Sequence, residues 1–285
     1  MLLGILTMLS VISGALIAAG TVGFENLQWL WVLPLGALGS FLALAALAFL
    51  FLWAMSAAVD LNKPQEKDSK FYRTMLRLYL EAVFTVLRPL FRVHTRGLEQ
   101  TPKNERFMLV CNHLDNLDPV TLIHFFRHSQ LAFISKRENY SMFLVGKLMH
   151  KLLCQPINRE NDREALKTIL KCVQILKEDK ASIAAFPEGY CSDDFLLHPF
   201  RHGVFKVALK TKVPIVVCTL QNTQYGFHNL ARLKKTDVHL HLVRVIRPEE
   251  YEGMTTVALG EWIHSLMAED LGPDLVLPGK TAENT

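Results

Sequence analysis

Two long uncharged stretches open the chain and predict membrane helices. Residues 1–24 carry no charged side chain, and after Glu25 the chain is uncharged again until Asp60. A helix needs about 20 apolar residues to cross a bilayer, so each stretch is long enough. Three tryptophans lie towards the ends of the second stretch, where interfacial aromatic side chains belong: Trp29, Trp31 and Trp53. The pattern predicts two transmembrane helices within residues 1–59.

The basic residues near these stretches predict an orientation. A cleaved signal peptide is the alternative for the first stretch, but such a peptide begins with basic residues, and no Lys or Arg precedes this one. Five basic residues follow the second stretch, whereas the short loop between the two has none: Lys63, Lys67, Lys70, Arg73 and Arg77. By the positive-inside rule the C-terminal part is cytoplasmic. We therefore expect a multi-pass protein of the cell membrane whose domain after the second stretch is cytoplasmic.

A polar and then amphipathic segment follows the apolar stretches. Residues 60–69 are polar and predict a linker. From Lys70 to Arg92 apolar positions recur with a helical period among arginines, and Pro89 is expected to bend or end this helix. Such a helix either lies on the membrane surface or packs on the domain that follows, and the sequence leaves both open. Residues 60–96 are thus predicted to be a linker and a basic amphipathic helix.

Beyond Gly97 short apolar runs alternate with segments of helical period. Strands are predicted over residues 106–111, 131–136, 181–186, 213–220 and 238–246. Helices are predicted to begin near Pro119 and over residues 142–153, 161–178, 203–211 and 256–270. This alternation predicts an α/β domain over residues 97–271, with a mostly parallel sheet flanked by helices. Residues 272–285 are expected to be a flexible tail.

Composition narrows the classes of partner and cofactor. The formal net charge of +4 is modest and predicts no nucleic-acid partner, while basic residues near the membrane suit anionic lipids. Five cysteines without a CxxC pair predict free thiols in a reducing cytoplasm. His239 and His241 are expected to be exposed strand residues without further metal ligands. We expect no metal and no tightly bound organic cofactor.

The stretch "NHLDNLDP" follows the first strand of the domain and contains a candidate catalytic pair. Five helical steps would place His113 and Asp118 on different faces of a helix, so contact between them requires a turn over residues 112–117. The alternative is that Asp118 before Pro119 is only a helix N-cap. In a contact, the carboxylate fixes the tautomer of an imidazole that takes a proton from an alcohol. No obvious nucleophile accompanies the pair, so the alcohol belongs to a substrate; Asp115 is a rival carboxylate.

Three further motifs follow in order: "PINRENDREA" with Arg159, "FPEG" and "VPIV". Together with "NHLDNLD" they resemble the 1-acylglycerol-3-phosphate acyltransferase family over about residues 70–270. The resemblance implies transfer of a fatty acyl group from acyl-CoA or acyl carrier protein, as co-substrate, to the free hydroxyl of 1-acylglycerol-3-phosphate. The product would be phosphatidic acid, for phospholipid biosynthesis. His113 would be the base and Asp118 its partner.

The resemblance also implies substrate-binding roles. Arg159 matches the arginine that serves the acceptor phosphate, and Glu188 and Gly189 match the acceptor-binding "FPEG" motif. Asn112 belongs to the first motif and is included in the substrate site. Three residues match the motif linked to the acyl donor or to a hydrophobic floor of the site: Val213, Pro214 and Ile215.

One position departs from the family pattern. The family continues "FPEG" with Thr-Arg, where the arginine binds phosphate, but this chain has Tyr190 and Cys191. A thiol cannot replace a guanidinium group, which binds phosphate through a charged two-pronged donor. Either other cations hold the phosphate, or the acceptor is a different lysophospholipid; the candidate residues are Lys136, Arg137, Arg159, Arg201 and His202.

Two other classes of function remain as alternatives. A membrane-anchored lipid-binding protein has no need of a base, so His113 and Asp118 argue against it. A hydrolase needs a nucleophile, and the sequence has no GxSxG motif to supply one.

Overall fold

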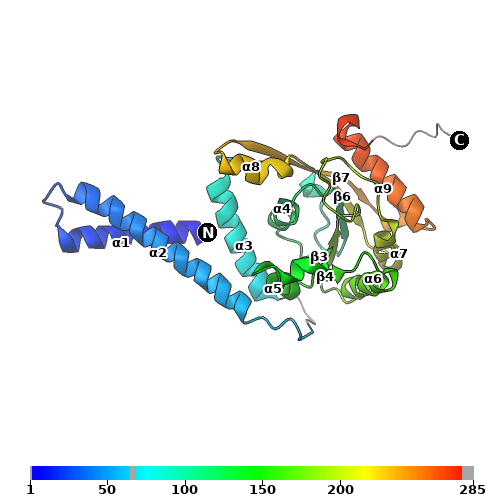
Figure 1. Ribbon diagram of the computed structural model, residues 1–285, viewed down its shortest axis with the longest axis horizontal. Helices are drawn as coiled ribbons and strands as arrows, with labels where there is room; N and C mark the ends of the chain where they lie inside the picture. Colours follow the sequence, from blue (N-terminus) through cyan, green and yellow to red (C-terminus); the bar gives the residue numbers. More distant parts are fainter. Residues whose placement is uncertain (1, 65–68, 278–285) are drawn as a thin grey trace.

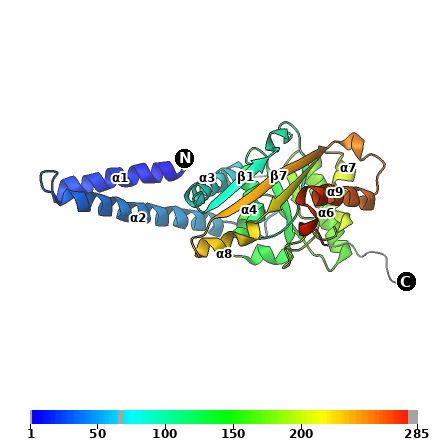
Figure 2. The ribbon, with the colours of Figure 1, turned by 90° about the horizontal axis from the view of Figure 1, so that it is seen from above.

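Two antiparallel helices form a hairpin that projects from the rest of the molecule (Figures 1 and 2). The computed structural model describes residues 2–64 and 69–277. Helix α1 spans Leu2–Thr21 and α2 spans Trp29–Ala57, and both are long and apolar enough to cross a membrane. A Cβ atom at Gly14 would lie 2.7 Å from the backbone of the facing helix, so a small residue is required for this close packing.

Helix α3 (Lys70–Leu87) fills the space between the hairpin and the sheet (Figure 1). Its Tyr72 and Tyr79 hydroxyls donate to the carbonyls of Met55 (2.8 Å) and Ala48 (2.6 Å) in α2. On the other side the buried Arg73 guanidinium donates to the Leu131 carbonyl at 3.3 Å. The sequence left two locations open for this helix. In the structure α3 packs on the following domain, and it also contacts the hairpin.

Seven strands form one sheet among the described residues, in the order β1-β7-β6-β2-β5-β3-β4. Their bounds are β1 Phe91–Arg96, β2 Met108–Cys111, β3 Leu131–Lys136, β4 Gln155–Ile157, β5 Ser182–Ala185, β6 Ile215–Gln221 and β7 Thr236–Ile246. Every neighbouring pair is parallel except β6 with β7. The prediction of a mostly parallel α/β sheet is confirmed.

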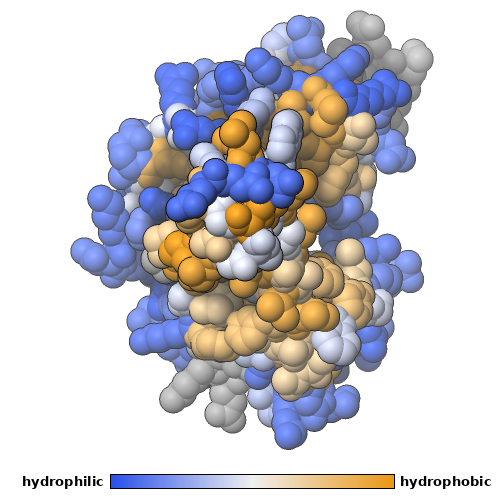
Figure 3. Space-filling view, turned by 90° about the vertical axis from the view of Figure 1, so that its left-hand side faces the viewer, coloured by the Kyte–Doolittle hydropathy of each residue, from blue (hydrophilic) through white to orange (hydrophobic). Residues whose placement is uncertain are grey.

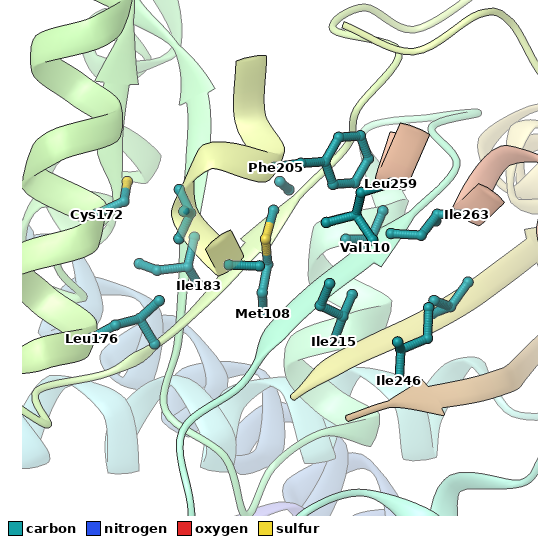
Figure 4. Close-up of a cluster of buried hydrophobic side chains, with 14 of the residues drawn as sticks. Met108, Val110, Cys172, Leu176, Ile183, Phe205, Ile215, Ile246, Leu259 and Ile263 are labelled. Carbon is teal, nitrogen blue, oxygen red and sulfur yellow. The ribbon is translucent and has the colours of Figure 1, made fainter. Parts of the chain in front are cut away.

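Helices cover both faces of this sheet, so its central strands are buried on both sides. The helices are α4 Leu117–Phe125, α5 Val145–Lys151, α6 Asp162–Lys177, α7 Lys206–Thr211, α8 Gly226–Ala231 and α9 Thr256–Leu271. In β2, Met108 and Val110 join one core cluster and Leu109 and Cys111 join the other, which explains why the strand is apolar throughout. Figure 4 shows the first cluster, with strand residues facing Phe205 and the α9 side chains.

Three elements were not predicted, and one boundary was wrong. Residues 91–96 form β1, paired with β7, so the sheet domain begins before residue 97. Strand β1 is an edge strand whose polar, mostly exposed side chains resemble the preceding amphipathic helix in sequence, and β4 and α8 are too short to show a period.

The first residues of the predicted tail are bonded to the sheet domain. The Leu197 N–H donates to the Leu275 carbonyl at 2.8 Å, and the Leu277 N–H donates to the Leu197 carbonyl at 3.1 Å. These backbone bonds hold residues 275–277 to the loop after β5. Residues 278–285 of the tail, and 65–68 of the linker, lie outside the described residues.

Candidate active site

His113 and Asp118 meet at the carboxyl end of β2, where the chain turns into α4. Asp118 is fully buried, and its Oδ2 accepts hydrogen bonds from the N–H groups of Leu114 (2.6 Å) and Asp115 (2.8 Å). The same oxygen lies 2.8 Å from His113 Nδ1. The turn that the sequence required for this contact is therefore present, and Asp118 both closes the turn and holds the imidazole.

The helix-cap alternative for Asp118 is wrong. Asn116 occupies the N-cap position of α4, and Asp118 lies inside the first turn of the helix. Its carboxylate points back to N–H groups that precede the helix, because those donors and His113 are the partners within reach. The rival carboxylate, Asp115, accepts from the Leu117 N–H at 2.9 Å, and burial raises its pKa.

The bonds of Asp118 determine which nitrogen of His113 can act as a base. Asp118 Oδ2 accepts two backbone N–H groups, so it is an acceptor for His113 Nδ1 as well, and that nitrogen carries the proton. The lone pair of the neutral ring is then on Nε2. The imidazole stacks on Phe186 with centroids 4.2 Å apart, and its side chain is 17% exposed. It can therefore reach a substrate while its orientation is fixed on two sides.

Glu188 supports the backbone of this turn. Its side chain is buried, at 1% exposure, and its two oxygens accept from the N–H groups of His113 (2.8 Å) and His198 (2.9 Å). Burial raises the pKa of this carboxyl to about 7, against the opposing effect of the two N–H bonds. Each oxygen already accepts one backbone N–H, and the contact of Glu188 with the acceptor stays a prediction.

Asn112 is likewise buried, and its side chain links the ends of two strands by hydrogen bonds. Its Nδ2 donates to the Leu220 carbonyl at 2.9 Å, and its Oδ1 accepts from the Leu220 N–H at 2.7 Å, which joins the end of β2 to β6. Its place in the substrate site stays a prediction. Lys136 is exposed at the end of β3, with Nζ 3.8 Å from Glu138 Oε1.

A cavity of about 560 Å³ lies beside the "FPEG" turn, whose Phe186, Pro187 and Gly189 line it. Phe186, on which His113 stacks, forms part of its wall. Four apolar residues from β3, β4 and α6 line it: Ile134, Ile157, Leu166 and Ile169. Arg159 and Arg201 line the same cavity. The cavity therefore combines an apolar wall with two cations, as a lipid with an anionic head group requires.

The two arginines lie close together. Arg201 Nη1 donates to the Arg159 carbonyl at 3.4 Å. Burial lowers the pKa of Arg159, and the neighbouring Arg201 lowers it further. Within residues 2–64 and 69–277, neither guanidinium forms an ion pair with a carboxylate. Two adjacent guanidinium groups without a carboxylate partner suit a phosphate.

Gly189 allows Arg201 to reach this position. Its φ is +85°, a left-handed conformation that favours glycine, and a Cβ there would lie 2.8 Å from Arg201 Cδ. The "FPEG" turn therefore packs directly against Arg201.

Cys191 lies on the histidine side of the site. The residue is exposed, but partial desolvation of the thiol and the nearby carboxylates, Asp118 first among them, raise the pKa of Cys191 to about 12. It is therefore a neutral thiol at neutral pH. The surrounding negative charge would attract a cation placed at this position.

The "VPI" motif lies at the opposite end of the strands. Ile215 pairs with Met108, the first residue of β2, and is fully buried. The carboxyl end of β2 is three residues, or about 10 Å, further along. The Val213 and Pro214 carbonyls accept from the Tyr251 hydroxyl (2.7 Å) and the Met108 N–H (2.9 Å). These residues thus form the core and the amino end of β6, and their role at the acyl donor or the floor of the site stays a prediction.

Residues 92–221 match the family model described as Acyltransferase. Residues 92–221 form an acyltransferase-family domain. The family resemblance predicted from the four motifs is confirmed.

Curated proteins with similar sequences are named as acyltransferases. The chain is 31% identical over 155 residues to a chloroplastic 1-acyl-sn-glycerol-3-phosphate acyltransferase, BAT2, of Brassica napus, covering 54% of this chain and 43% of the relative. It is 31% identical over 180 residues to a probable 1-acyl-sn-glycerol-3-phosphate acyltransferase of Mycoplasma pneumoniae, covering 61% of this chain and 64% of that one. The matched regions thus span about half the length of these relatives.

A solved structure shares the fold. The 1-acyl-sn-glycerophosphate (LPA) acyltransferase PlsC from Thermotoga maritima matches with a TM-score of 0.59, over 78% of this chain and 86% of that chain. The sequence identity is 21%, so the likeness concerns the fold.

Sequence reasoning missed the apolar wall of the acyltransferase domain. Phe186 contributes to that wall and to the stacking on His113, and its position directly before "PEG" was the available signal. Ile134, Ile157 and Leu166 carry no local signal, because only the folded chain brings β3, β4 and α6 together.

The pKa of Glu188 generates a prediction about stability. Its folded pKa, about 7, lies above the ordinary value of 4.5, so between these pH values the folded state binds more protons than the unfolded state. The stability that the protonated form provides is therefore lost as pH rises from 4.5 to 7, by at most about 1.4 kcal/mol per pH unit. Glu188→Gln, which mimics the protonated form, should remove this dependence.

Thermal unfolding in detergent at pH 5 and pH 7.5 measures the effect. The melting temperature of the wild type minus that of Glu188→Gln should be lower at pH 7.5 than at pH 5. Glu178→Gln, on an exposed carboxylate, is the matched control. An equal difference at both pH values would contradict the raised pKa.

The position of Ile215 generates a second prediction. Ile215→Ala should cost about 2–5 kcal/mol of stability because it empties a packed core position. The KM values of both substrates, per folded protein, should not change. Ile134→Ala is the matched substitution in the cavity wall and should raise a substrate KM. If the KM for the acyl donor rises in Ile215→Ala without loss of stability, the "VPI" motif does bind the acyl donor.

Proposed function

We propose that this protein is a membrane-anchored 1-acylglycerol-3-phosphate O-acyltransferase that forms phosphatidic acid. Several curated relatives are named for this activity, although each is matched over only part of its length. The acyl donor is a thioester, acyl-CoA or acyl carrier protein. The observation that supports the proposal most strongly is the cavity lined by Arg159 and Arg201. Phe186 forms part of its wall and stacks on His113.

In this proposal His113 is the general base. Its Nε2 removes the proton from the acceptor hydroxyl as the oxygen attacks the thioester carbonyl carbon. Asp118 stabilises the imidazolium that forms, through the 2.8 Å contact with Nδ1. When the tetrahedral intermediate collapses, the C–S bond breaks and the thiolate takes the proton back from His113. The enzyme ends the cycle in its starting protonation state.

The cavity orients the acceptor. Arg159 and Arg201 bind the phosphate, while apolar side chains such as Leu166 contact the acyl chain already present. Because Phe186 both lines the cavity with the arginines and stacks on His113, a phosphate at the arginines would leave the far end of the glycerol to point towards the imidazole. Lys136 is an additional cation at the end of β3.

In the membrane α1 and α2 cross the bilayer, and the sheet domain lies on the cytoplasmic side. Both helices have the required length and hydropathy, and the basic residues follow α2. The hairpin then holds the enzyme beside its lipid substrate.

A second acceptor is supported by one observation. Cys191 stands where the family has a phosphate-binding arginine, and carboxylates surround its thiol. A lysophospholipid with a capped phosphate carries less charge and needs fewer cations, so it is the alternative acceptor.

The role of His113 is tested directly by substitution. His113→Ala should lower the transfer rate by about 10² to 10⁴, because the general base is lost. His198→Ala removes a histidine from the neighbouring loop and serves as the control. Near-normal activity of His113→Ala at equal expression and equal melting temperature would exclude the proposed base.

The acceptor is tested with the protein reconstituted in vesicles, labelled acyl-CoA or acyl carrier protein, and a panel of lysolipids. Arg159→Ala should weaken use of 1-acylglycerol-3-phosphate about ten- to a hundredfold, the usual effect of removing a charged partner of a buried ion. The rise should be mainly in KM. Arg163→Ala, in the exposed first turn of α6, is the control.

Cys191→Arg separates the two acceptors. It should leave unchanged or improve use of 1-acylglycerol-3-phosphate, because it adds a phosphate ligand. The deciding observation is made on a capped lysophospholipid: if the wild type prefers that lipid and Cys191→Arg abolishes activity on it, the capped lipid is the true acceptor.

A further inference from the structure

Two apolar side chains stand out on the surface of the sheet domain. Outside residues 2–57, the most exposed large apolar side chains of the described chain are Leu233, at 78%, and Phe143, at 70%. Leu233 lies in the turn between α8 and β7, and Phe143 lies in the segment before α5. The cavity and the histidine pair involve neither residue.

The backbone at both places holds these side chains outwards. Leu233 has φ +53° and Leu144, next to Phe143, has φ +66°. Left-handed conformations are unfavourable for leucine, so each turn is set by its surroundings and not by local preference. Lys234 N–H donates to the Asn229 carbonyl at 2.8 Å and closes the turn on which Leu233 sits.

Both turns lie on the side of the domain from which the hairpin projects. The Leu144 carbonyl accepts from Ser56 Oγ at 3.5 Å, and Lys147 Nζ donates to the Ala57 carbonyl at 3.4 Å, so the Phe143 segment contacts the end of α2. The Leu233 turn leads into Thr236, whose N–H donates to Leu90 just beyond α3. In Figures 1 and 2, α3 and α8 lie towards the hairpin and α9 lies away from it.

The charges around these side chains suit an anionic surface. Leu233 is flanked by three exposed cations: Arg232, Lys234 and Lys235. Figure 3 looks along the hairpin, whose apolar helices project towards the viewer in the centre of the view, while hydrophilic side chains surround them at the margin. A basic turn with an apolar tip combines electrostatic attraction to anionic lipids with burial of the tip in the headgroup region.

We propose that this side of the sheet domain rests on the bilayer, with Phe143 and Leu233 inserted among the headgroups of anionic lipids. The inference rests on the proposed insertion of the hairpin: the contacts of Ser56 and Lys147 place the Phe143 segment beside the C-terminal end of α2, which that insertion puts at the membrane surface. It does not depend on acyl transfer. The two turns are then additional membrane contacts that fix the orientation of the domain above its lipid substrates.

The test uses a fluorophore sensitive to polarity on the full chain. Cys191, the exposed cysteine of the five, is replaced by Ser, and a single cysteine is introduced by Leu233→Cys or Phe143→Cys. Glu261→Cys places the label on the exposed side of α9, away from the hairpin, as the matched control. The labelled proteins are reconstituted in vesicles with or without phosphatidylglycerol and with lipids that carry a quencher near the headgroup.

The labels at positions 233 and 143 should shift to shorter emission wavelengths and be quenched by these lipids, whereas the label at 261 should not. Lys234→Glu with Lys235→Glu should lower the inserted population at 233 in anionic vesicles by roughly fivefold per lysine, since one cation near an anionic surface contributes about 1 kcal/mol. In vesicles of phosphatidylcholine alone the double substitution should have little effect.

Labels at 233 and 143 that behave as the label at 261 would overturn the proposal. A label at 233 that is shielded in detergent and unaffected by lipid quenchers would assign this surface to contact between copies of the chain. Extraction with alkaline carbonate is measured in parallel. Protein that is released shows that the hairpin is not inserted, which distinguishes failure of the anchor from failure of the surface contacts.

Discussion

The site depends on one buried carboxylate, that of Asp118. Burying an ionised carboxyl group is costly unless donors surround it, and here one oxygen accepts two backbone N–H groups and lies against His113 Nδ1. The same three contacts therefore close the turn after β2, orient the imidazole and determine its tautomer. Any change that relaxes the turn also releases the histidine.

Two further buried side chains make the same kind of tie around His113. Glu188 joins the His113 backbone to the loop at His198, and Asn112 joins the end of β2 to Leu220. The polar residues of the motifs thus act largely on backbone at the carboxyl ends of parallel strands. The groups left to meet a substrate are His113, the wall at Phe186 and the arginines beyond it. Carboxylates gather on the histidine side and cations on the other, so an acceptor with a hydroxyl and a phosphate has one favourable orientation.

The sequence predicted the sheet, most of its elements and the His113–Asp118 contact, because those depend on periodicity and on one turn. It did not predict β1, whose polar edge position gives little signal, or the wall of the cavity, which forms only when distant elements meet. Motif membership alone does not show what a side chain contacts. Glu188 and Ile215 belong to motifs linked to substrate, yet one binds backbone and the other packs in the core. A motif identifies residues that are needed together, while burial decides whether they contact a ligand.

The protonation of His113 tests the central claim most directly. In ¹⁵N-histidine-labelled protein reconstituted in vesicles, solid-state NMR distinguishes a protonated from an unprotonated ring nitrogen, and His113→Asn identifies the resonances of His113 by their loss. At a pH where the ring is neutral, Nδ1 should be protonated and Nε2 should not. Asp118→Asn should change this pattern. A neutral His113 with its proton on Nε2 would mean that Asp118 donates instead of accepting, and would contradict the account of His113 as a base held ready by a buried carboxylate.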